Sequence, residues 1–272
     1  MLKTNQPPAA CAYVHTGEAR FAATAYTRGP WNPAHQHAGP PIALICRNLE
    51  QAAALHGLTH LARLTANLLR PIPVGELNVL VSADYIGKNA GHFAAQLLAG
   101  GKEVARCTAL FQRENAVDLP APLAGHPLPL ADASPEDARP AQFPFADGQP
   151  GYAELMSIRE ARGKNFQGPC AVWFRLNYPL VLGEATSTYQ RVAVAADSGN
   201  GISAILDYTR HQFVNADLTI NLLRRPVGEW ICLDAHTALG DTGGGIAQSR
   251  LLDTTGLIGH ATQSLSVRLG AP

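Results

Sequence analysis

Histidine spacing is the first pattern in this chain that could indicate chemistry. His35 and His37 are two positions apart, and paired histidines are common metal ligands, but no cysteine or carboxylate lies beside them in the sequence. A metal site needs three or four converging ligands. We therefore expect both histidines to pack or to line a pocket, and we expect no metal.

The cysteines and the first eight residues indicate the cellular compartment in which we expect the protein. The five cysteines are spread singly, without a C-x-x-C spacing, so they indicate neither a disulfide framework nor a zinc cage. Residues 1–8 contain prolines and polar residues where a signal peptide has an apolar stretch. We expect reduced, mostly buried thiols in a cytoplasmic protein.

Two further catalytic motifs are not supported. The glycine run at residues 243–245 is not followed by Lys-Ser/Thr and has strand-like flanks, so it indicates a turn and not a phosphate-binding loop. No G-x-S-x-G is present, which removes the nucleophile elbow of the serine hydrolases.

Charge and hydropathy exclude two classes of partner. In 272 residues, 21 Lys and Arg balance 21 Asp and Glu, so the formal net charge is zero. The chain therefore lacks the excess of basic residues that binding of a polyanion requires. No apolar run approaches the roughly 18 residues of a membrane span. We expect neither a nucleic-acid nor a membrane partner.

A proline-rich stretch and a repeated segment indicate how the chain is divided into domains. Eight of the 20 prolines fall between Pro120 and Pro150, where they exclude a helix or a central strand. Residues 64–70 (LTANLLR) recur as residues 218–224 (LTINLLR), six identities in seven positions. We therefore predict a duplicated domain: residues 1–114, a linker at 115–165, and residues 166–272.

Each copy shows the same order of elements. An apolar segment that predicts a buried helix precedes each repeat, at residues 40–55 and 189–197. Strand-like segments separated by glycines follow. They occupy residues 76–83, 91–99 and 103–111 in the first copy, and 229–238, 245–253 and 257–268 in the second. One buried helix followed by long antiparallel strands is an α+β arrangement, with a sheet wrapped around a helix.

This duplicated order resembles the double hotdog fold, and local motifs resemble acyl-CoA thioesterases. Residues 31–41 (WNPAHQHAGPP) resemble the H-G-G-x-P type of start to a hotdog helix. The second half resembles the acyl-CoA thioesterase II family at residues 178–180, 190–191, 196–197, 217–219 and 262–263. The resemblance implies two tandem hotdogs and hydrolysis of a fatty or aryl acyl-CoA, with coenzyme A as part of the substrate and no other cofactor.

The resemblance also implies which residues bind the attacking water. The family uses an Asp on the second helix, a Thr or similar group on a following strand, and a Gln on a late strand; Asp197 and Gln263 match the first and last. Asn215 stands where the family has Thr, and Thr219 is the second candidate. In a regular strand, Asn215, Asp217 and Thr219 would share one face. Asn for Thr keeps a hydrogen-bonding group but changes its length and donor geometry.

The first copy is expected to supply the opposite wall of one composite site. The repeat places Ala43 opposite Asp197 and Thr108 opposite Gln263, so the first copy lacks both groups. Free N–H groups at the start of the first helix could bind the thioester carbonyl. Because each following proline removes an N–H, this role is expected of Ala38 and Gly39. The resemblance adds His37, which holds the position of the family His, so we assign substrate binding to His37, Ala38 and Gly39.

Several alternatives stay open. An acyl chain is expected in an apolar tunnel along the helices, and Arg70, Arg224 and Arg225 are candidate phosphate contacts or simply solvated charges. A non-catalytic acyl-CoA-binding protein is one alternative, and a hotdog enoyl-CoA hydratase or dehydratase is another, although no His follows Asp197 at the spacing that enzyme uses. A homo-oligomer of double-hotdog chains, paired through their sheets, is also open.

Overall fold

The computed structural model describes residues 10–120, 128–207 and 210–269. Its first half contains β1 (Tyr13–Gly17), β2 (Arg20–Ala23), the 3-10 helix η1 (Ala25–Thr27), α1 (Gly39–Ala54), β3 (His60–Leu68), β4 (Glu76–Ile86), β5 (Ala90–Ala99) and β6 (Lys102–Gln112). Its second half contains β7 (Arg139–Ala141), α2 (Tyr152–Leu155), β8 (Met156–Arg162), β9 (Cys170–Leu176), α3 (Thr188–Ala196), α4 (Gly199–Ile202), β10 (His211–Asn215), β11 (Asp217–Leu222), β12 (Ile231–Leu239), β13 (Gly244–Asp253) and β14 (Gly256–Leu269).

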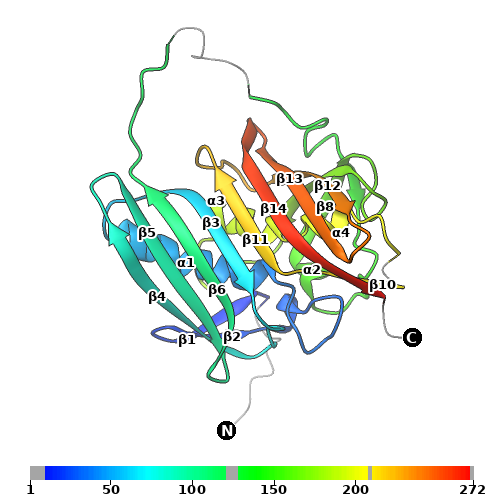
Figure 1. Ribbon diagram of the computed structural model, residues 1–272, viewed down its shortest axis with the longest axis horizontal. Coiled ribbons are helices and arrows are strands. Elements are labelled where there is room, and N and C mark those ends of the chain that lie inside the picture. Colours follow the sequence, from blue (N-terminus) through cyan, green and yellow to red (C-terminus); the bar gives the residue numbers. More distant parts are fainter. Residues whose placement is uncertain (1–9, 121–127, 208–209, 270–272) are drawn as a thin grey trace.

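The strands form one continuous antiparallel sheet, in the order β1-β2-β4-β5-β6-β3-β11-β14-β13-β12-β9-β8-β7, with β10 pairing β14. Both predicted helices and all six predicted strands are confirmed, with ends that shift by a few residues. Figure 1 shows the halves side by side, with β3 of the first half next to β11 of the second half. The two tandem hotdogs expected from the repeat are therefore present.

The repeated segments meet at the centre of the sheet. Strand β3 pairs with β11, and Thr65 faces Thr219, its counterpart in the repeat. Pairing on either side of these residues is symmetric, since Leu64 faces Ile220 and Ala66 faces Leu218. A pseudo-twofold axis thus passes between the two threonines, as in an isologous dimer interface.

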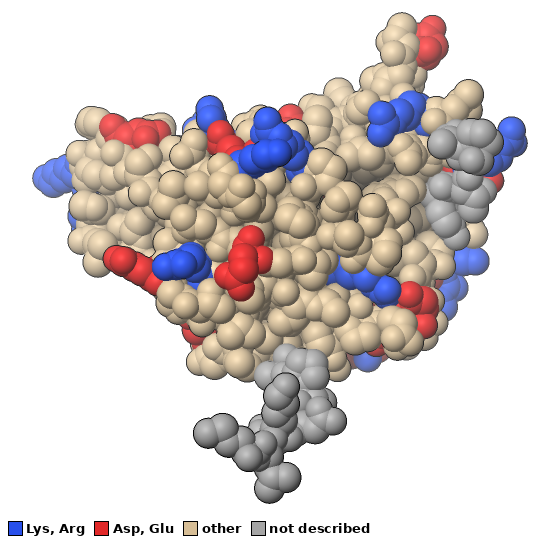
Figure 2. Space-filling view, turned by 90° about the horizontal axis from the view of Figure 1, so that it is seen from below, with Lys and Arg blue, Asp and Glu red and all other residues tan. Residues whose placement is uncertain are grey.

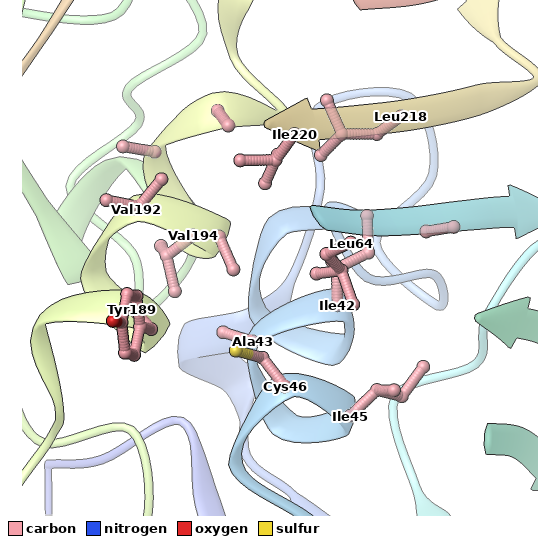
Figure 3. Packing of buried hydrophobic residues seen from close by; sticks show 14 of the residues in the cluster. Ile42, Ala43, Ile45, Cys46, Leu64, Tyr189, Val192, Val194, Leu218 and Ile220 are labelled. Carbon is pink, nitrogen blue, oxygen red and sulfur yellow. The ribbon is translucent and has the colours of Figure 1, made fainter. Parts of the chain in front are cut away.

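Helices α1 and α3 form the centre of the core. Ile42, Ala43 and Cys46 of α1 are fully buried, and Val192 and Val194 of α3 are at most 1% exposed. Figure 3 shows Ala43 and Cys46 on the side of α1 that faces α3, and Ile42 beside Leu64 of β3. Full burial of each larger aliphatic side chain stabilises the fold by about 1.5–3 kcal/mol.

Gly39 sets the spacing of this helix pair. An added Cβ there would lie 2.4 Å from the backbone oxygen of Val194. The start of α1 therefore lies against the end of α3, and the two helices run antiparallel.

Part of the range expected to be a linker has regular structure. Residues 139–162 form β7, α2 and β8, and β7 is the edge strand. The segment before β7 crosses the sheet: Trp173 Nε1 donates to the Ala133 carbonyl at 2.8 Å, and the Leu257 amide donates to the Pro129 carbonyl at 2.9 Å. A proline-rich strap can thus cover a sheet through its carbonyl groups, which need no N–H of their own.

Candidate active site

Asp197 is the centre of a buried polar cluster. It caps the C-terminus of α3, and its side chain is only 3% exposed. The negative end of the helix dipole lies at the C-terminus, so it destabilises a carboxylate there. Burial adds a desolvation cost, so nearby hydrogen-bond donors have to compensate the charge.

Three side chains surround the Asp197 carboxylate. His37 Nδ1 lies 2.9 Å from Oδ2, Asn215 Nδ2 donates to Oδ1 at 2.5 Å, and Gln263 Nε2 lies 3.5 Å from Oδ1. They come from the segment before α1, from the end of β10 and from β14. Both halves of the chain therefore contribute to one site.

Gln263 is held by the turn that follows Asp197. Its Nε2 donates to the Asp197 backbone oxygen at 3.0 Å, and its Oε1 accepts from the Asn200 amide at 2.9 Å. These two bonds fix the orientation of the amide group, and the residue is 2% exposed. Gln263 is thus an inward residue of β14.

A bulge separates the roles of Asn215 and Thr219. Asn215 pairs with Leu265 and Thr219 with Thr262, so four steps along β10 and β11 oppose three along β14. One extra residue reverses which side chains point inward. The expectation that Asn215 and Thr219 share a face is therefore wrong.

Thr219 lies away from the site. Its neighbours Leu218 and Ile220 are buried in the core, and its own hydroxyl donates to Thr65 Oγ1 at 3.2 Å. The structure brings Asp197, Asn215 and Gln263 together and leaves Thr219 at the pseudo-twofold axis. Sequence alternation could not reveal this, because the bulge at residues 216–217 has no glycine or proline to mark it.

His37 has two partners on one nitrogen. The Gly39 amide points to Nδ1 at 3.2 Å, and Asp197 Oδ2 lies 2.9 Å from the same atom. A protonated Nδ1 donates to Asp197, whereas an unprotonated Nδ1 accepts from Gly39. The arrangement can therefore hold a proton between His37 and Asp197.

The start of α1 offers few amide donors to a substrate. Ala38 is the N-cap, Gly39 is the first helical residue, and Pro40 and Pro41 have no N–H. The Gly39 amide is directed to His37. Of the expected substrate-binding residues, Ala38 and Gly39 thus lie beside the cluster, and His37 is part of it.

Tyr152 is a site residue that sequence analysis missed. Its ring stacks on the His37 imidazole, with centroids 3.6 Å apart and planes 2° apart. Its hydroxyl donates to the Val194 carbonyl at 3.1 Å and lies 2.7 Å from Ser198 Oγ. Burial raises the pKa of Tyr152 well above its usual value, so the hydroxyl keeps its proton. Tyr152 lies within residues 115–165, where we expected only a linker.

Glu50 lies at the opposite end of the helix pair. Its Oε2 accepts from Ser187 Oγ at 2.8 Å and from Gln190 Nε2 at 2.9 Å, the two residues of the capping box that starts α3. Burial raises the pKa of Glu50, and these two hydrogen bonds partly offset the rise. The first copy thus has Ala43, and not a carboxylate, at the position that corresponds to Asp197. It has the partly buried Glu50 nearer the end of α1, where the carboxylate binds the N-terminal cap of α3.

The arginines considered for phosphate binding already have partners. Arg224 makes two bonds to the buried Asp253, at 2.6 and 2.7 Å, Arg225 contacts Glu114 and the Thr59 carbonyl, and Arg70 donates to the Glu103 carbonyl. Figure 2 shows one mostly uncharged face, where basic side chains lie near acidic ones. These guanidinium groups therefore already have protein partners, and phosphate contacts at the three positions stay a prediction.

Two features of the described residues bear on metals and membranes. No group of three or more His, Cys, Asp or Glu side chains is arranged to hold a metal ion there. No helix in these parts of the chain has the length and apolar character to cross a membrane.

Comparisons with known proteins place both halves in one family. A family model described as "Acyl-CoA thioesterase N-terminal domain" matches residues 27–112, and one described as "Acyl-CoA thioesterase C-terminal domain" matches residues 135–267. A search of curated proteins finds no match.

Solved structures share the fold at low identity. A thioesterase described as putative, from Novosphingobium aromaticivorans, is 20% identical with a TM-score of 0.69, covering 94% of this chain and 98% of its own. A thioesterase II from Thermobifida fusca, described likewise, is 16% identical with a TM-score of 0.70, covering 95% of each chain. The acyl-CoA thioesterase II TesB2 from Mycobacterium marinum is 15% identical with a TM-score of 0.62, covering 95% of this chain and 96% of its own.

Proposed function

This chain belongs to the acyl-CoA thioesterase family, and we propose that it hydrolyses an acyl-CoA thioester to a free acid and coenzyme A through a water held by Asp197, Asn215 and Gln263. The observation that carries the proposal is the convergence of His37, Asn215 and Gln263 on the buried Asp197 carboxylate. Such a group can act as a general base without a metal or a covalent nucleophile.

In the proposed reaction, Asp197 takes a proton from water while the water oxygen attacks the thioester carbonyl. The amides of Asn215 and Gln263 orient the water and keep the carboxylate in place. The carbonyl becomes an oxyanion, which the Ala38 N–H stabilises, joined by the Gly39 N–H when His37 Nδ1 is protonated and donates to Asp197 instead of accepting from Gly39. The C–S bond then breaks, and the proton held between Asp197 and His37 passes to the departing thiolate.

Release of free thiol from a panel of acyl-CoAs, from short to long chains and including aryl groups, tests the proposal. We expect turnover of at least one member. If none is hydrolysed while an acyl-CoA still raises the melting temperature, the chain is instead a non-catalytic acyl-CoA-binding protein.

A hydratase is the second candidate because His37 lies beside Asp197. The sequence has no His at the expected spacing after Asp197, but the first half supplies one at 2.9 Å. An Asp and His pair can add water across an enoyl-CoA double bond. Loss of the enoyl absorbance of crotonyl-CoA without release of thiol would favour this reaction over hydrolysis.

A further inference from the structure

The side chain of Asn200, three residues after Asp197, has no role in the proposed mechanism. Asn200 belongs to α4 and is 7% exposed. Its Oδ1 is buried and has no hydrogen-bond partner among the described residues. A buried carbonyl oxygen without a partner is destabilising, so native proteins retain few of them, and each needs a reason such as catalysis or a bound water.

The first strand after α4 sets the orientation of this side-chain amide. Asn200 Nδ2 donates to the Phe213 carbonyl of β10 at 3.5 Å, and an oxygen in the same place would face another oxygen. Oδ1 is therefore the atom that is turned away from this carbonyl. The bond to Phe213 is long, so it does not by itself account for an amide at a buried position.

Asn200 contacts both strands that supply amides to the catalytic cluster. Its main-chain amide donates to Gln263 Oε1 on β14 at 2.9 Å. Phe213, which binds its side chain, lies two residues before Asn215 on β10, so the two side chains share one face of that strand. The Asn200 side chain thus lies beside the amides that surround the Asp197 carboxylate.

The attacking water has two hydrogens, and the proposed mechanism assigns only one of them, which Asp197 takes. The side-chain nitrogens of Asn215 and Gln263 are donors directed at Asp197. The side-chain oxygen of Gln263 already accepts from the Asn200 main chain. The oxygen of Asn215 is a competing acceptor, but this residue is partly exposed, so solvent can bind it.

We propose that Asn200 Oδ1 accepts the second hydrogen of the attacking water, an inference that rests on the proposed thioesterase function. As the water oxygen attacks the carbonyl carbon, it loses electron density, and its remaining O–H becomes a stronger donor. The hydrogen bond to Asn200 therefore strengthens in the transition state and lowers the barrier for attack. The proton taken by Asp197 passes to the departing thiolate, and the hydrogen bound by Asn200 leaves with the acid product.

The variant Asn200→Leu has nearly the size of the parent side chain but no acceptor, and it keeps the main-chain bond to Gln263. Because the lost bond is strongest in the transition state, we expect kcat to fall about tenfold or more with KM little changed. The melting temperature should stay close to that of the parent, since an apolar group replaces an oxygen without a partner.

A second buried asparagine offers a matched control. Asn165 is 8% exposed, and its Nδ2 donates to the Gln142 carbonyl at 3.0 Å, outside the cluster. Asn165→Leu removes this bond, so the opposite pattern is expected: a lower melting temperature and a kcat close to that of the parent.

Methanol as a competing nucleophile reports on the second hydrogen directly. It has one O–H, which Asp197 takes, and a methyl group where water carries its second hydrogen. Asn200→Leu should therefore slow hydrolysis but not methanolysis, and the ratio of methyl ester to free acid should rise about tenfold over the parent. Asn200→Ala, which also makes room for the methyl group, should raise this ratio further and serves as the test if Asn200→Leu does not fold.

Two results would overturn the assignment. A parental kcat in the folded Asn200 variants would mean that another group, such as Asn215 Oδ1, accepts the second hydrogen. Equal slowing of hydrolysis and methanolysis would mean that Asn200 only holds the cluster in place. Failure of the proposed function looks different, because the parent would then release thiol from no acyl-CoA at all.

Discussion

The hydroxyl groups of Thr65 and Thr219, which occupy the same place in the two copies of the repeat, lie 3.2 Å apart across the pairing of β3 and β11. This contact marks the pseudo-twofold axis that relates the two hotdogs. It also separates Thr219 from the catalytic cluster, whereas Asn215, before the bulge, donates to Asp197. The two candidates for the third water ligand therefore predict different mutational effects.

Replacing Asn215 by Ala should lower kcat/KM by tenfold or more. The substitution removes a hydrogen bond to a buried carboxylate, and such bonds contribute about 1.5–3 kcal/mol. Thr219→Val is the matched control and should stay within about twofold of the parent. Steady-state thiol release measures both, and a larger loss in Thr219→Val than in Asn215→Ala would contradict the assignment.

Tyr152 should act by positioning His37. Tyr152→Phe keeps the stacked ring, so we expect activity within a few-fold of the parent. Tyr152→Leu removes the stacking, and a misplaced group close to the chemistry can cost about 100-fold in rate. We expect a large loss of kcat together with a shifted pH profile. A folded Tyr152→Leu protein with parental kcat and pH profile would refute this role.

Gly39 should be intolerant of a side chain. Gly39→Ala would place Cβ 2.4 Å from the Val194 carbonyl oxygen, and overpacking costs about 1–3 kcal/mol. We expect a melting temperature several degrees lower and a weaker His37 to Asp197 contact. Gly75→Ala is the control, since a Cβ there meets nothing within 4 Å. Equal melting temperatures for the two variants would count against close packing of α1 on α3.

Glu50 should make stability depend on pH. Burial raises its pKa in the folded protein above the ordinary 4.5, so the folded state binds its proton more tightly than the unfolded state does. The resulting contribution is complete below about pH 4.5 and is lost as pH rises through the folded pKa. Relative to Glu50→Gln, the parent should lose free energy of unfolding between pH 4 and pH 8, as measured by urea unfolding. Parallel pH curves would exclude the effect.

Sequence periodicity and the repeat predict the two buried helices, six of the strands and their α+β arrangement, and the resemblance adds the double hotdog. The buried helices at residues 40–55 and 189–197 are predicted from mostly apolar segments, and the strands are predicted from segments separated by glycines. Their pairing across the pseudo-twofold axis is what a duplicated segment such as residues 64–70 implies. The strap before β7 was missed because its contacts are made through backbone carbonyl groups, which any sequence supplies.

The site could be predicted only in part. Asp197, Asn215 and Gln263 were suggested by resemblance, and the structure brings them together. Tyr152 was missed because its role comes from a long-range stacking contact with His37 that no local pattern encodes. The exclusion of Thr219 depends on a one-residue bulge, and bulges without glycine have no reliable sequence signal.

The most direct measurement is free thiol release from the acyl-CoA panel by the parent and by Asp197→Asn, side by side. Asn keeps the size of Asp but cannot take a proton from water. The account predicts turnover by the parent and a loss of at least 100-fold in the variant, within the range for a general base, with an unchanged melting temperature as evidence of folding. A folded Asp197→Asn protein as active as the parent would contradict the central claim that Asp197 activates the attacking water.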